Sequence, residues 1–337
     1  MSISANKFKH YLHRYFIDAM SAMAQGLFAS LLIGTIISTL GTQFNIPLLT
    51  EIGGYAKAAA GPAMAVAIGY ALQAPPLVLF SLVAVGSASN TLGGAGGPLA
   101  VFFLAIVAAE LGKLVSRKTK IDIIVTPLVT ILSGCLLAYL LAPYIGSAAS
   151  SVGQLIMWAT EQQPLLMGIV VSVIVGMVLT LPISSAAICA ALGLTGLAGG
   201  AAVAGCCAQM IGFAVISFRE NRFGGLVAQG LGTSMLQMGN IIRNPRIWIP
   251  ATLASAITGP LSTTLFRLEC TGVSAGMGTC GLVGPLGIIT ATAERTPLFW
   301  VGLLLVCFIL PALLSLLFSE LLRRIGWIRE GDMKLDL

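Results

Sequence analysis

Two glycine-rich segments, each running into Gly-Pro-Leu, are the strongest candidates for a binding site in this sequence. The first is NTLGGAGGP at Asn90–Pro98, and the second is GVSAGMGTCGLVGP at Gly272–Pro285. A proline after flexible glycines begins a helix whose free N–H groups point back toward the glycines, and the positive end of its dipole favours an anionic or polar ligand group. The pair predicts two helix starts that share one site. Each segment could equally be a tight turn between membrane spans.

Polar side chains near these segments supply the hydrogen-bond donors and acceptors that sugar hydroxyls require. Asn90, Thr91 and Thr279 lie just before Gly-Pro-Leu, and Gln73 and Gln209 occupy similar places in the two halves of the chain. The predicted solute-binding residues are Gln73, Asn90, Thr91, Gly94, Gly97, Pro98, Gln209, Glu269, Thr279, Gly281, Gly284 and Pro285. One otherwise apolar segment carries a further polar set: Gln229, Thr233, Gln237 and Asn240. Such groups also bond neighbouring membrane helices, which is their commoner role.

Charged side chains next to the second segment form another candidate set, because charges inside a membrane are costly and usually functional. Arg267 and Glu269 precede that segment, and Glu294 and Arg295 follow the helix that it starts. Ion pairs at loop ends are the plain alternative for these four residues.

Enzyme signatures are absent from the sequence. The two histidines, His10 and His13, both lie near the N-terminus, and there is no HExxH, GxSxG or P-loop pattern. The seven cysteines form no CxxC motif and are expected to be small buried apolar residues. We therefore expect no catalytic residue, no metal and no cofactor, and a membrane-embedded enzyme is the weakest of the possible functions.

The composition indicates an integral membrane protein without a soluble domain. Hydrophobic residues make up 57% of the 337 residues and charged residues 9%, against roughly 25% charged residues in soluble domains. The 39 glycines suit closely packed helices. The net charge of +6 is explained by basic residues in cytoplasmic loops, so no nucleic-acid partner is expected.

The apolar runs predict an all-α polytopic membrane protein of about ten transmembrane helices in two pseudo-symmetric, inverted halves, with glycine-rich re-entrant hairpins. The expected spans are 19–41, 55–73, 76–90, 98–115, 121–143, 164–181, 187–217 (broken near Gly193), 223–239, 247–266 and 297–320. The expected parts are a basic amphipathic helix at 1–17, halves at 18–145 and 164–325, a surface linker with a short amphipathic helix at 146–163 and a tail at 326–337.

Two sequence matches suggest that the halves are duplicated. GLFASLLIG at Gly26–Gly34 matches GIVVSVIVG at Gly168–Gly176, and GAGGPL at Gly94–Leu99 matches GLVGPL at Gly281–Leu286. Inverted repeats with paired broken segments are typical of secondary transporters, whose site lies near the midplane. Small residues at this spacing would also arise from helix packing alone.

Basic residues predict the topology. No cleavable signal peptide is expected, and both termini are placed in the cytoplasm of a bacterial cell, with the spans in its inner membrane. Four arginines, Arg219, Arg222, Arg243 and Arg246, conflict with this arrangement. Either the segment 223–239 does not cross the membrane, or some of these arginines face a cavity.

The two-half architecture, the GxxGPL segments and TGVSAGMGTCGLVGPLG at Thr271–Gly287 resemble the membrane component, enzyme IIC, of bacterial phosphotransferase-system sugar transporters. The similarity covers about 15–330 and extends to the branch of perfringolysin O regulator-like membrane proteins. It implies a homodimeric translocation channel that binds sugar in re-entrant hairpins. The sequence departs from that family's complete permeases in having no fused IIA or IIB domain and no histidine in a membrane span, so coupling to phosphorylation would need separate IIA and IIB proteins.

Two functions remain open at this point. The first is a transporter that moves a small polar solute, a sugar or an organic anion, by alternating access between the two GxxGPL hairpins. The second is a membrane sensor or regulator that kept the pocket but not transport. If the hairpins share a site, we expect Gly97→Leu and Gly284→Leu to abolish ligand binding while the protein stays folded and dimeric.

Overall fold

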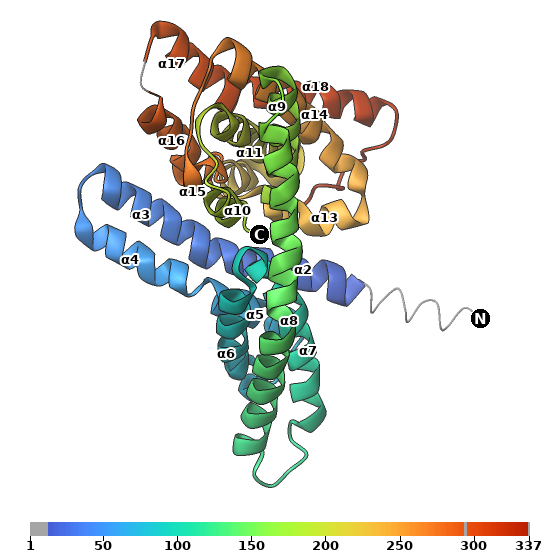
Figure 1. The fold of residues 1–337 in the computed structure, drawn as a ribbon. Coiled ribbons are helices and arrows are strands. Elements are labelled where there is room, and N and C mark those ends of the chain that lie inside the picture. The colour runs from blue at the N-terminus through green and yellow to red at the C-terminus, as the bar shows by residue number, and fades with distance from the viewer. Residues whose placement is uncertain (1–12, 293–294, 336–337) are drawn as a thin grey trace. The chain divides into compact units, whose positions relative to one another are not determined.

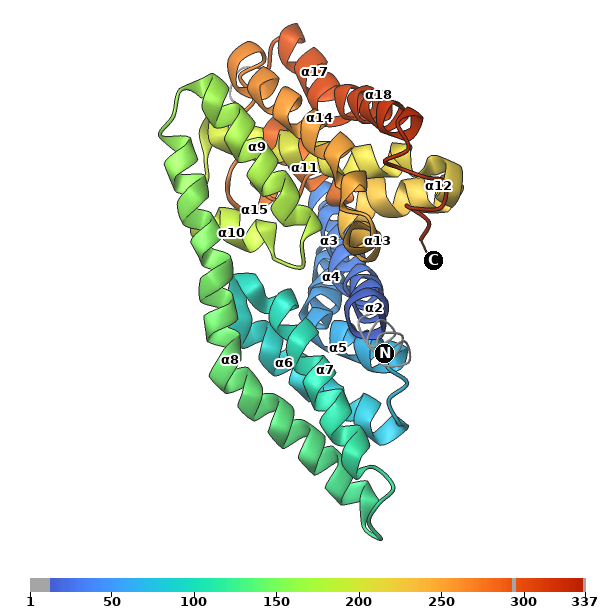
Figure 2. The same ribbon diagram turned by 90° about the vertical axis from the view of Figure 1, so that its right-hand side faces the viewer.

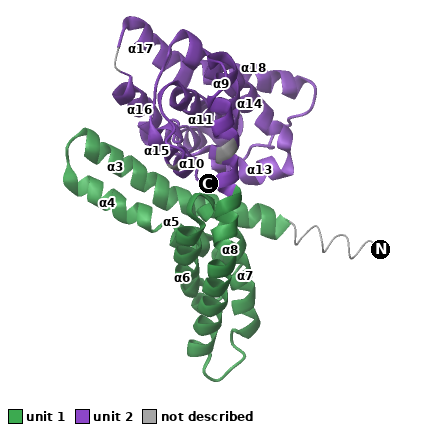
Figure 3. Ribbon diagram, in the orientation of Figure 1, with its two compact units in different colours: residues 1–148 green, residues 149–337 purple. Residues whose placement is uncertain are grey.

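The computed structural model describes residues 13–292 and 295–335, which are helical almost throughout and contain no strand. The chain divides into two compact units, Met1–Ala148 and Ala149–Leu337 (Figure 3). The predicted all-α membrane architecture is confirmed, whereas the number of spans and the inverted repeat stay predictions. The amphipathic helix expected over 1–17 lies mainly outside the described residues, as does Glu294.

Among the described residues, five helical stretches are long and apolar enough to cross a membrane. They are His13–Gln43, Pro76–Val115, Asp122–Thr160, Gly196–Ile216 and Pro297–Arg324. Shorter apolar helices cover Ala60–Ala71, Pro164–Thr180 and Cys280–Ala291. The protein is therefore a multi-pass membrane protein.

The first helical stretch of unit 1 ends in a tight hairpin. It consists of η1 (His13–Asp18), α2 (Ala19–Leu27), η2 (Phe28–Leu32) and α3 (Ile33–Gln43), and α4 (Pro47–Ala58) runs back along α3 (Figure 1). A Cβ atom at Gly41 would lie 2.6 Å from the backbone nitrogen of Thr50, so small residues allow the close approach. The expected span 55–73 is thus split, because α4 ends at Ala58 and α5 covers Ala60–Ala71.

The rest of unit 1 is a bundle of α5, α6 (Pro76–Gly93), α7 (Gly97–Val115) and the first part of α8 (Asp122–Thr160) (Figures 1 and 2). Proline stands in the first turn of α6 and α7, where its missing N–H would have had no partner within the helix. An apolar core joins α7 to α8 and consists of Ala100, Leu104, Ala138 and Ala142. Helix α8 of the same unit therefore lies next to the glycine-rich turn between α6 and α7.

Helix α8 runs without a break over Asp122–Thr160. A short amphipathic helix was expected within the predicted linker 146–163, and residues 146–160 are helical as the continuation of α8. Gly146 packs on the backbone of Gly93, and the Ser147 hydroxyl donates to Pro143 O at 2.9 Å. The division between the two units falls within α8, between Ala148 and Ala149.

Unit 2 is built around the buried helix α11 (Gly196–Ile216). Three helices pack against it: α9 (Pro164–Thr180), α14 (Ile249–Pro260) and α18 (Leu310–Arg324). Glycine allows this packing, because a Cβ atom at Gly205 would collide with the carbonyl of Ser172 on α9. The predicted break near Gly193 is present, since α10 (Ser185–Ala191) ends before it and Gly193 has φ of +59°.

Residues 217–248 form a series of short helices rather than one span, and we call them the broken region. They are α12 (Phe218–Val227), η4 (Ala228–Gly232), η5 (Ser234–Gln237), α13 (Met238–Arg243) and η6 (Pro245–Trp248). The expected span 223–239 is therefore not a continuous helix. This agrees with the alternative that it does not cross the membrane.

The remaining elements are α14 (Ile249–Pro260), η7 (Leu261–Leu265), α15 (Gly272–Ala275), η8 (Cys280–Leu282), α16 (Val283–Ala291), α17 (Pro297–Leu304), η9 (Leu305–Ile309) and α18 (Leu310–Arg324) (Figure 2). Two ion pairs tie α18 to α12. Arg219 lies 2.8 Å from Glu320, and Arg323 lies 3.0 Å from Glu220. Arg219 and Arg323 thus have carboxylate partners within unit 2.

Candidate functional site

The first glycine-rich segment is the turn of a helical hairpin. Gly94 closes α6 with φ of +50° and ψ of −119°, a conformation open to glycine and strained for other residues. A 3-10 turn over Gly94–Gly96 follows, and α7 begins with Gly97 and Pro98, which are both buried. The proline therefore begins a helix directly after a glycine turn, as the sequence predicts.

Asn90 is part of this turn. It lies in the last turns of α6, and a Cβ atom at Gly97 would lie 2.6 Å from its side-chain oxygen. Thr91 and Gly94 are exposed beside it. The neighbouring Ser89 was not predicted as a site residue, yet it is fully buried and its hydroxyl has no hydrogen-bond partner in the described part of the chain. Only its place one residue before Asn90 could have drawn attention to it.

Gln73 does not belong to this cluster. It lies exposed, with φ of +55°, in the turn between α5 and α6. The 18 residues of α6 separate it from the glycine turn, and a helix of that length measures about 27 Å at its usual rise per residue. The far end of the hairpin is held by Lys113, whose Nζ lies 2.6 Å from Leu72 O and 2.7 Å from Glu110 Oε1.

The second glycine-rich segment is a compact loop in unit 2. Gly278, Gly281 and Leu282 have positive φ values of +54°, +52° and +61°. The N–H of Gly284 donates back to Gly278 O at 2.8 Å, and α16 begins around it at Val283. Pro285 is buried in the first turn of this helix. The loop thus folds on itself before the helix starts.

Side-chain contacts fix this loop against its neighbours. The Thr279 hydroxyl donates to Gly230 O at 2.5 Å and lies 3.6 Å from Met210 Sδ. A Cβ atom at Gly278 would lie 2.8 Å from Cys206 on α11. Thr279, Gly281, Gly284 and Pro285 therefore occupy one loop that is seated on α11 and η4.

Glu269 approaches this loop from the other end of α16. Its N–H donates to the Thr292 hydroxyl at 3.2 Å, so its backbone is attached to the residue after α16. Its side chain is half-buried, whereas Arg267 and Arg295 are exposed.

Gln209 belongs to a separate polar cluster. Its Oε1 accepts from Trp248 Nε1 at 2.9 Å and from the Thr180 hydroxyl at 3.3 Å, and its Nε2 donates to the Thr252 hydroxyl at 3.3 Å. Thr180 in turn lies 2.7 Å from the Ser234 hydroxyl. The buried Gln209 amide is therefore satisfied by neighbouring helices, which is the packing role that the sequence also allowed.

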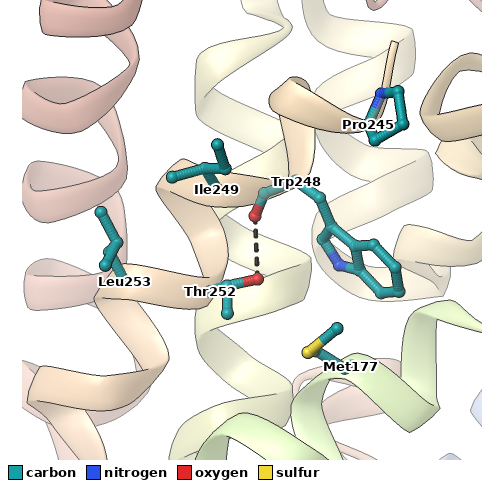
Figure 4. Close-up of a pocket in the computed structure, with 6 residues that line it drawn as sticks. All are labelled: Met177, Pro245, Trp248, Ile249, Thr252 and Leu253. Carbon is teal, nitrogen blue, oxygen red and sulfur yellow. Dashed lines mark hydrogen bonds between the residues drawn. The ribbon is translucent and has the colours of Figure 1, made fainter. Parts of the chain in front are cut away.

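A cavity of about 270 Å³ opens beside this cluster (Figure 4). Its lining is mainly apolar and comes from α9, η6 and α14: Met177, Pro245, Trp248, Ile249, Thr252 and Leu253. The Thr252 hydroxyl donates to Trp248 O at 2.9 Å (Figure 4). The sequence pointed to Gln209 but not to this cavity, which forms only when α9 and α14 pack together.

The arrangement suits binding of an uncharged or anionic group by hydrogen bonds. Each unit contains a buried Gly-Pro helix start, preceded by Gly94 with a positive φ in the first and by Gly278 and Gly281 with positive φ values in the second. Helix N–H groups therefore lie beside the turn in both.

Comparison with known proteins adds the family. A family model described as phosphotransferase system, EIIC, matches residues 17–335. A search among curated proteins finds no matching relative. The resemblance drawn from the glycine-rich motifs is confirmed at this level, and the regulator-like branch stays a prediction.

Proposed function

The chain belongs to the EIIC family of the phosphotransferase system, and on that premise we propose that it carries a small polar solute, a sugar or an organic anion, by alternating access. Members of this family are membrane permease components of the sugar type and are not enzymes themselves. We place the solute at the two GxxGPL segments. The protein would work as a homodimer in the bacterial inner membrane, with both termini in the cytoplasm.

The observation that supports this placement is that both units contain a helix that starts with a buried proline after a glycine-rich turn. Pro98 and Pro285 are buried in the first turns of α7 and α16, and each follows a glycine-rich turn with positive φ values. Two helix N-termini beside partly exposed turns can bind a polar group and release it. The remaining predicted residues have different roles: Gln209 is held by helix contacts, and Gln73 lies at the far end of α6.

The structure changes which substitutions can test the placement. A Cβ atom at Gly97 would lie 2.7 Å from Asn90 O, and one at Gly284 would collide with Gly278 O. Gly97→Leu and Gly284→Leu are therefore expected to disturb the fold, contrary to the expectation from sequence. Thr91→Ala in the exposed part of the first turn is the better variant. Gln73→Ala is its matched control, because Gln73 is equally exposed but distant.

The experiment is uptake of labelled sugars and organic anions into proteoliposomes, together with ligand-induced thermal stabilisation of the purified protein. We expect one solute to be taken up, and Thr91→Ala to weaken its binding about tenfold while Gln73→Ala leaves binding unchanged. A solute that stabilises the protein but is never transported would identify a sensor instead. Equal effects of both variants would contradict the placement at the first turn.

The same vesicles test energy coupling. Separate IIA and IIB proteins with a phosphoryl donor should convert the entering solute to its phosphate ester if the protein works within a complete phosphotransferase system. Accumulation of unmodified solute under those conditions would contradict coupled transport.

A further inference from the structure

Residues 325–335, which follow α18, lie along the broken region and are held there through their backbone. We call them the docked segment. Asn221 Nδ2 donates to Met333 O at 2.8 Å, and Asn221 Oδ1 accepts from Leu335 N at 2.8 Å. Gln237 Nε2 also donates to Met333 O, at 3.0 Å. One asparagine therefore bonds the peptide groups on both sides of Lys334, in the way that an amide side chain recognises extended backbone.

Two further asparagines continue the same pattern. Asn240 Nδ2 donates to Lys334 O at 2.9 Å. Asn244 Nδ2 donates to Trp327 O at 3.0 Å and to Asp332 Oδ2 at 2.8 Å. Four amide side chains of the broken region thus bond one segment that lies 83 to 114 residues later in the chain.

Apolar contacts reinforce this attachment. Met333 is 0% exposed and Ile328 is 2% exposed, although most residues around them are open to solvent. Buried side chains at two positions combined with hydrogen bonds to the main chain are typical of a bound peptide. The docked segment is therefore bound to unit 2 by both apolar contacts and hydrogen bonds.

The residues that bind the docked segment are connected to a network of buried hydrogen bonds. Gln237 Nε2 donates to Gln229 Oε1 at 2.9 Å, and Gln229 Nε2 donates to the Ser217 hydroxyl at 2.9 Å. Gln229, Gln237 and Ser217 are each 0% exposed. Loss of one member leaves a buried polar group without a partner, so the network favours one arrangement strongly. Gln229 and Gln237, two of the polar residues that the sequence shows on an otherwise apolar segment, are members of this network.

The network reaches the second glycine-rich loop through residues 228–237. Gly230, next to Gln229, accepts the hydrogen bond from Thr279, and Ser234 bonds Thr180 beside Gln209. This stretch is a π-helix followed by a 3-10 helix, irregular geometries that often mark functional hinges. The same short stretch thus contacts the docked segment on one side and the glycine-rich loop on the other.

We propose that Asn221, Gln237, Asn240 and Asn244 form an intramolecular peptide-binding site whose ligand is the docked segment, and that docking holds residues 228–237 where Gly230 bonds Thr279. Release of the segment removes the partners of these amides and frees the stretch to move with the glycine-rich loop. The proposal concerns unit 2 alone and holds whichever solute the protein carries.

Hydrogen exchange of the full-length protein, read by mass spectrometry, tests the binding site. Within the described residues, both hydrogen bonds of the Asn221 side chain go to the docked segment. Asn221→Ala should therefore make amides of 326–335 exchange about tenfold faster, as expected for the loss of two hydrogen bonds. Gln162→Ala is the control, because its side-chain amide donates to Trp158 O near the end of α8, away from the docked segment. Unprotected amides in 326–335 of the unmodified protein would overturn the proposal, as would equal exchange in the two variants.

A second variant tests the connection to the loop. Gln237→Met keeps the side-chain length but removes the donors to Met333 O and Gln229 Oε1. We expect faster exchange in 326–335, in 228–237 and in 272–285, with the rest of unit 2 unchanged. Faster exchange in 326–335 alone would overturn the link to Thr279. If Gln237→Met does not fold, Asn244→Ala and Thr279→Val replace it: Asn244→Ala should accelerate 326–335, and Thr279→Val should accelerate 228–237.

Discussion

The two glycine-rich segments share Gly-Pro-Leu but are supported differently. The first joins α6 and α7, helices of 18 and 19 residues, and turns at Gly94 with α8 behind it. The second joins the 4-residue α15 to the 9-residue α16, and bonds itself and η4. The first is therefore the end of a long hairpin, whereas the second is an internal loop whose position depends on distant residues.

This difference assigns different tasks to the two helix starts. A hairpin turn with exposed Thr91 and Gly94 can change its local conformation while the helices beneath it stay in place. A loop that is bonded to the broken region can move only if that region moves with it. On the two proposals above, the first segment would supply contacts to the solute, and the second would be the one that docking of residues 325–335 regulates.

The largest expected effect is a loss of stability from overpacking, and it should be greater at the second helix start than at the first. Gly284→Ala would press a methyl group onto the carbonyl of Gly278, which already accepts the Gly284 N–H, so we expect a loss of about 3 kcal/mol of stability. Gly97→Ala meets the movable Asn90 amide as well as backbone, and should cost about half as much. Thermal unfolding in detergent measures both. Gly54→Ala, with open space around it, is the control, and equal losses at Gly97 and Gly284 would remove the distinction.

A smaller effect is expected from the conformation of the first turn. Gly94 has open space around its Cα but a φ of +50° and ψ of −119°, so Gly94→Ala should cost about 2 kcal/mol through backbone strain alone. Gly224→Ala has equally open space without a positive φ and should be neutral or slightly stabilising. Comparison of the melting temperatures of the Gly94→Ala and Gly224→Ala proteins tests this expectation. A Gly94→Ala protein as stable as Gly224→Ala would show that the turn can adopt another conformation.

The smallest effect compares the two threonines. Thr279→Val removes the donor to Gly230 O and leaves a buried carbonyl without that bond, at a cost of about 1–2 kcal/mol. Thr91→Val changes an exposed side chain and should alter stability by less than about 0.5 kcal/mol. Chemical denaturation of both variants is sufficient for this measurement. A large loss at Thr91 would indicate that the first turn is packed as firmly as the second loop.

Sequence reasoning located the helix starts and breaks well where the signal is local. Pro76, Pro98, Pro164 and Pro297 stand in the first turns of their helices, and the break near Gly193 lies at a positive φ. It was less successful at the extent of a helix. A short amphipathic helix was expected within the linker 146–163, whereas residues 146–160 extend α8, with Gly146 packed on Gly93.

For the candidate site too, sequence reasoning was successful in grouping residues that lie close together in sequence and less successful where they lie far apart. Five predicted residues of unit 1 gather at one turn, namely Asn90, Thr91, Gly94, Gly97 and Pro98, because all lie close together in sequence at the turn of one hairpin. Gln73 and Gln209 were chosen by their similar positions in the two halves, and neither lies in a glycine-rich segment. Position along a repeat does not determine which way a side chain faces or what it bonds.

The sequence by itself determined that this protein is a bundle of membrane helices interrupted by two glycine-rich turns, because apolar length, proline and glycine act within a few residues. Only the tertiary structure decided that the broken region is not one continuous helix and that residues 325–335 are bound to it. Those outcomes depend on hydrogen bonds such as Asn221 to Met333, across 112 residues. Their partners come together only after the helices between them have packed.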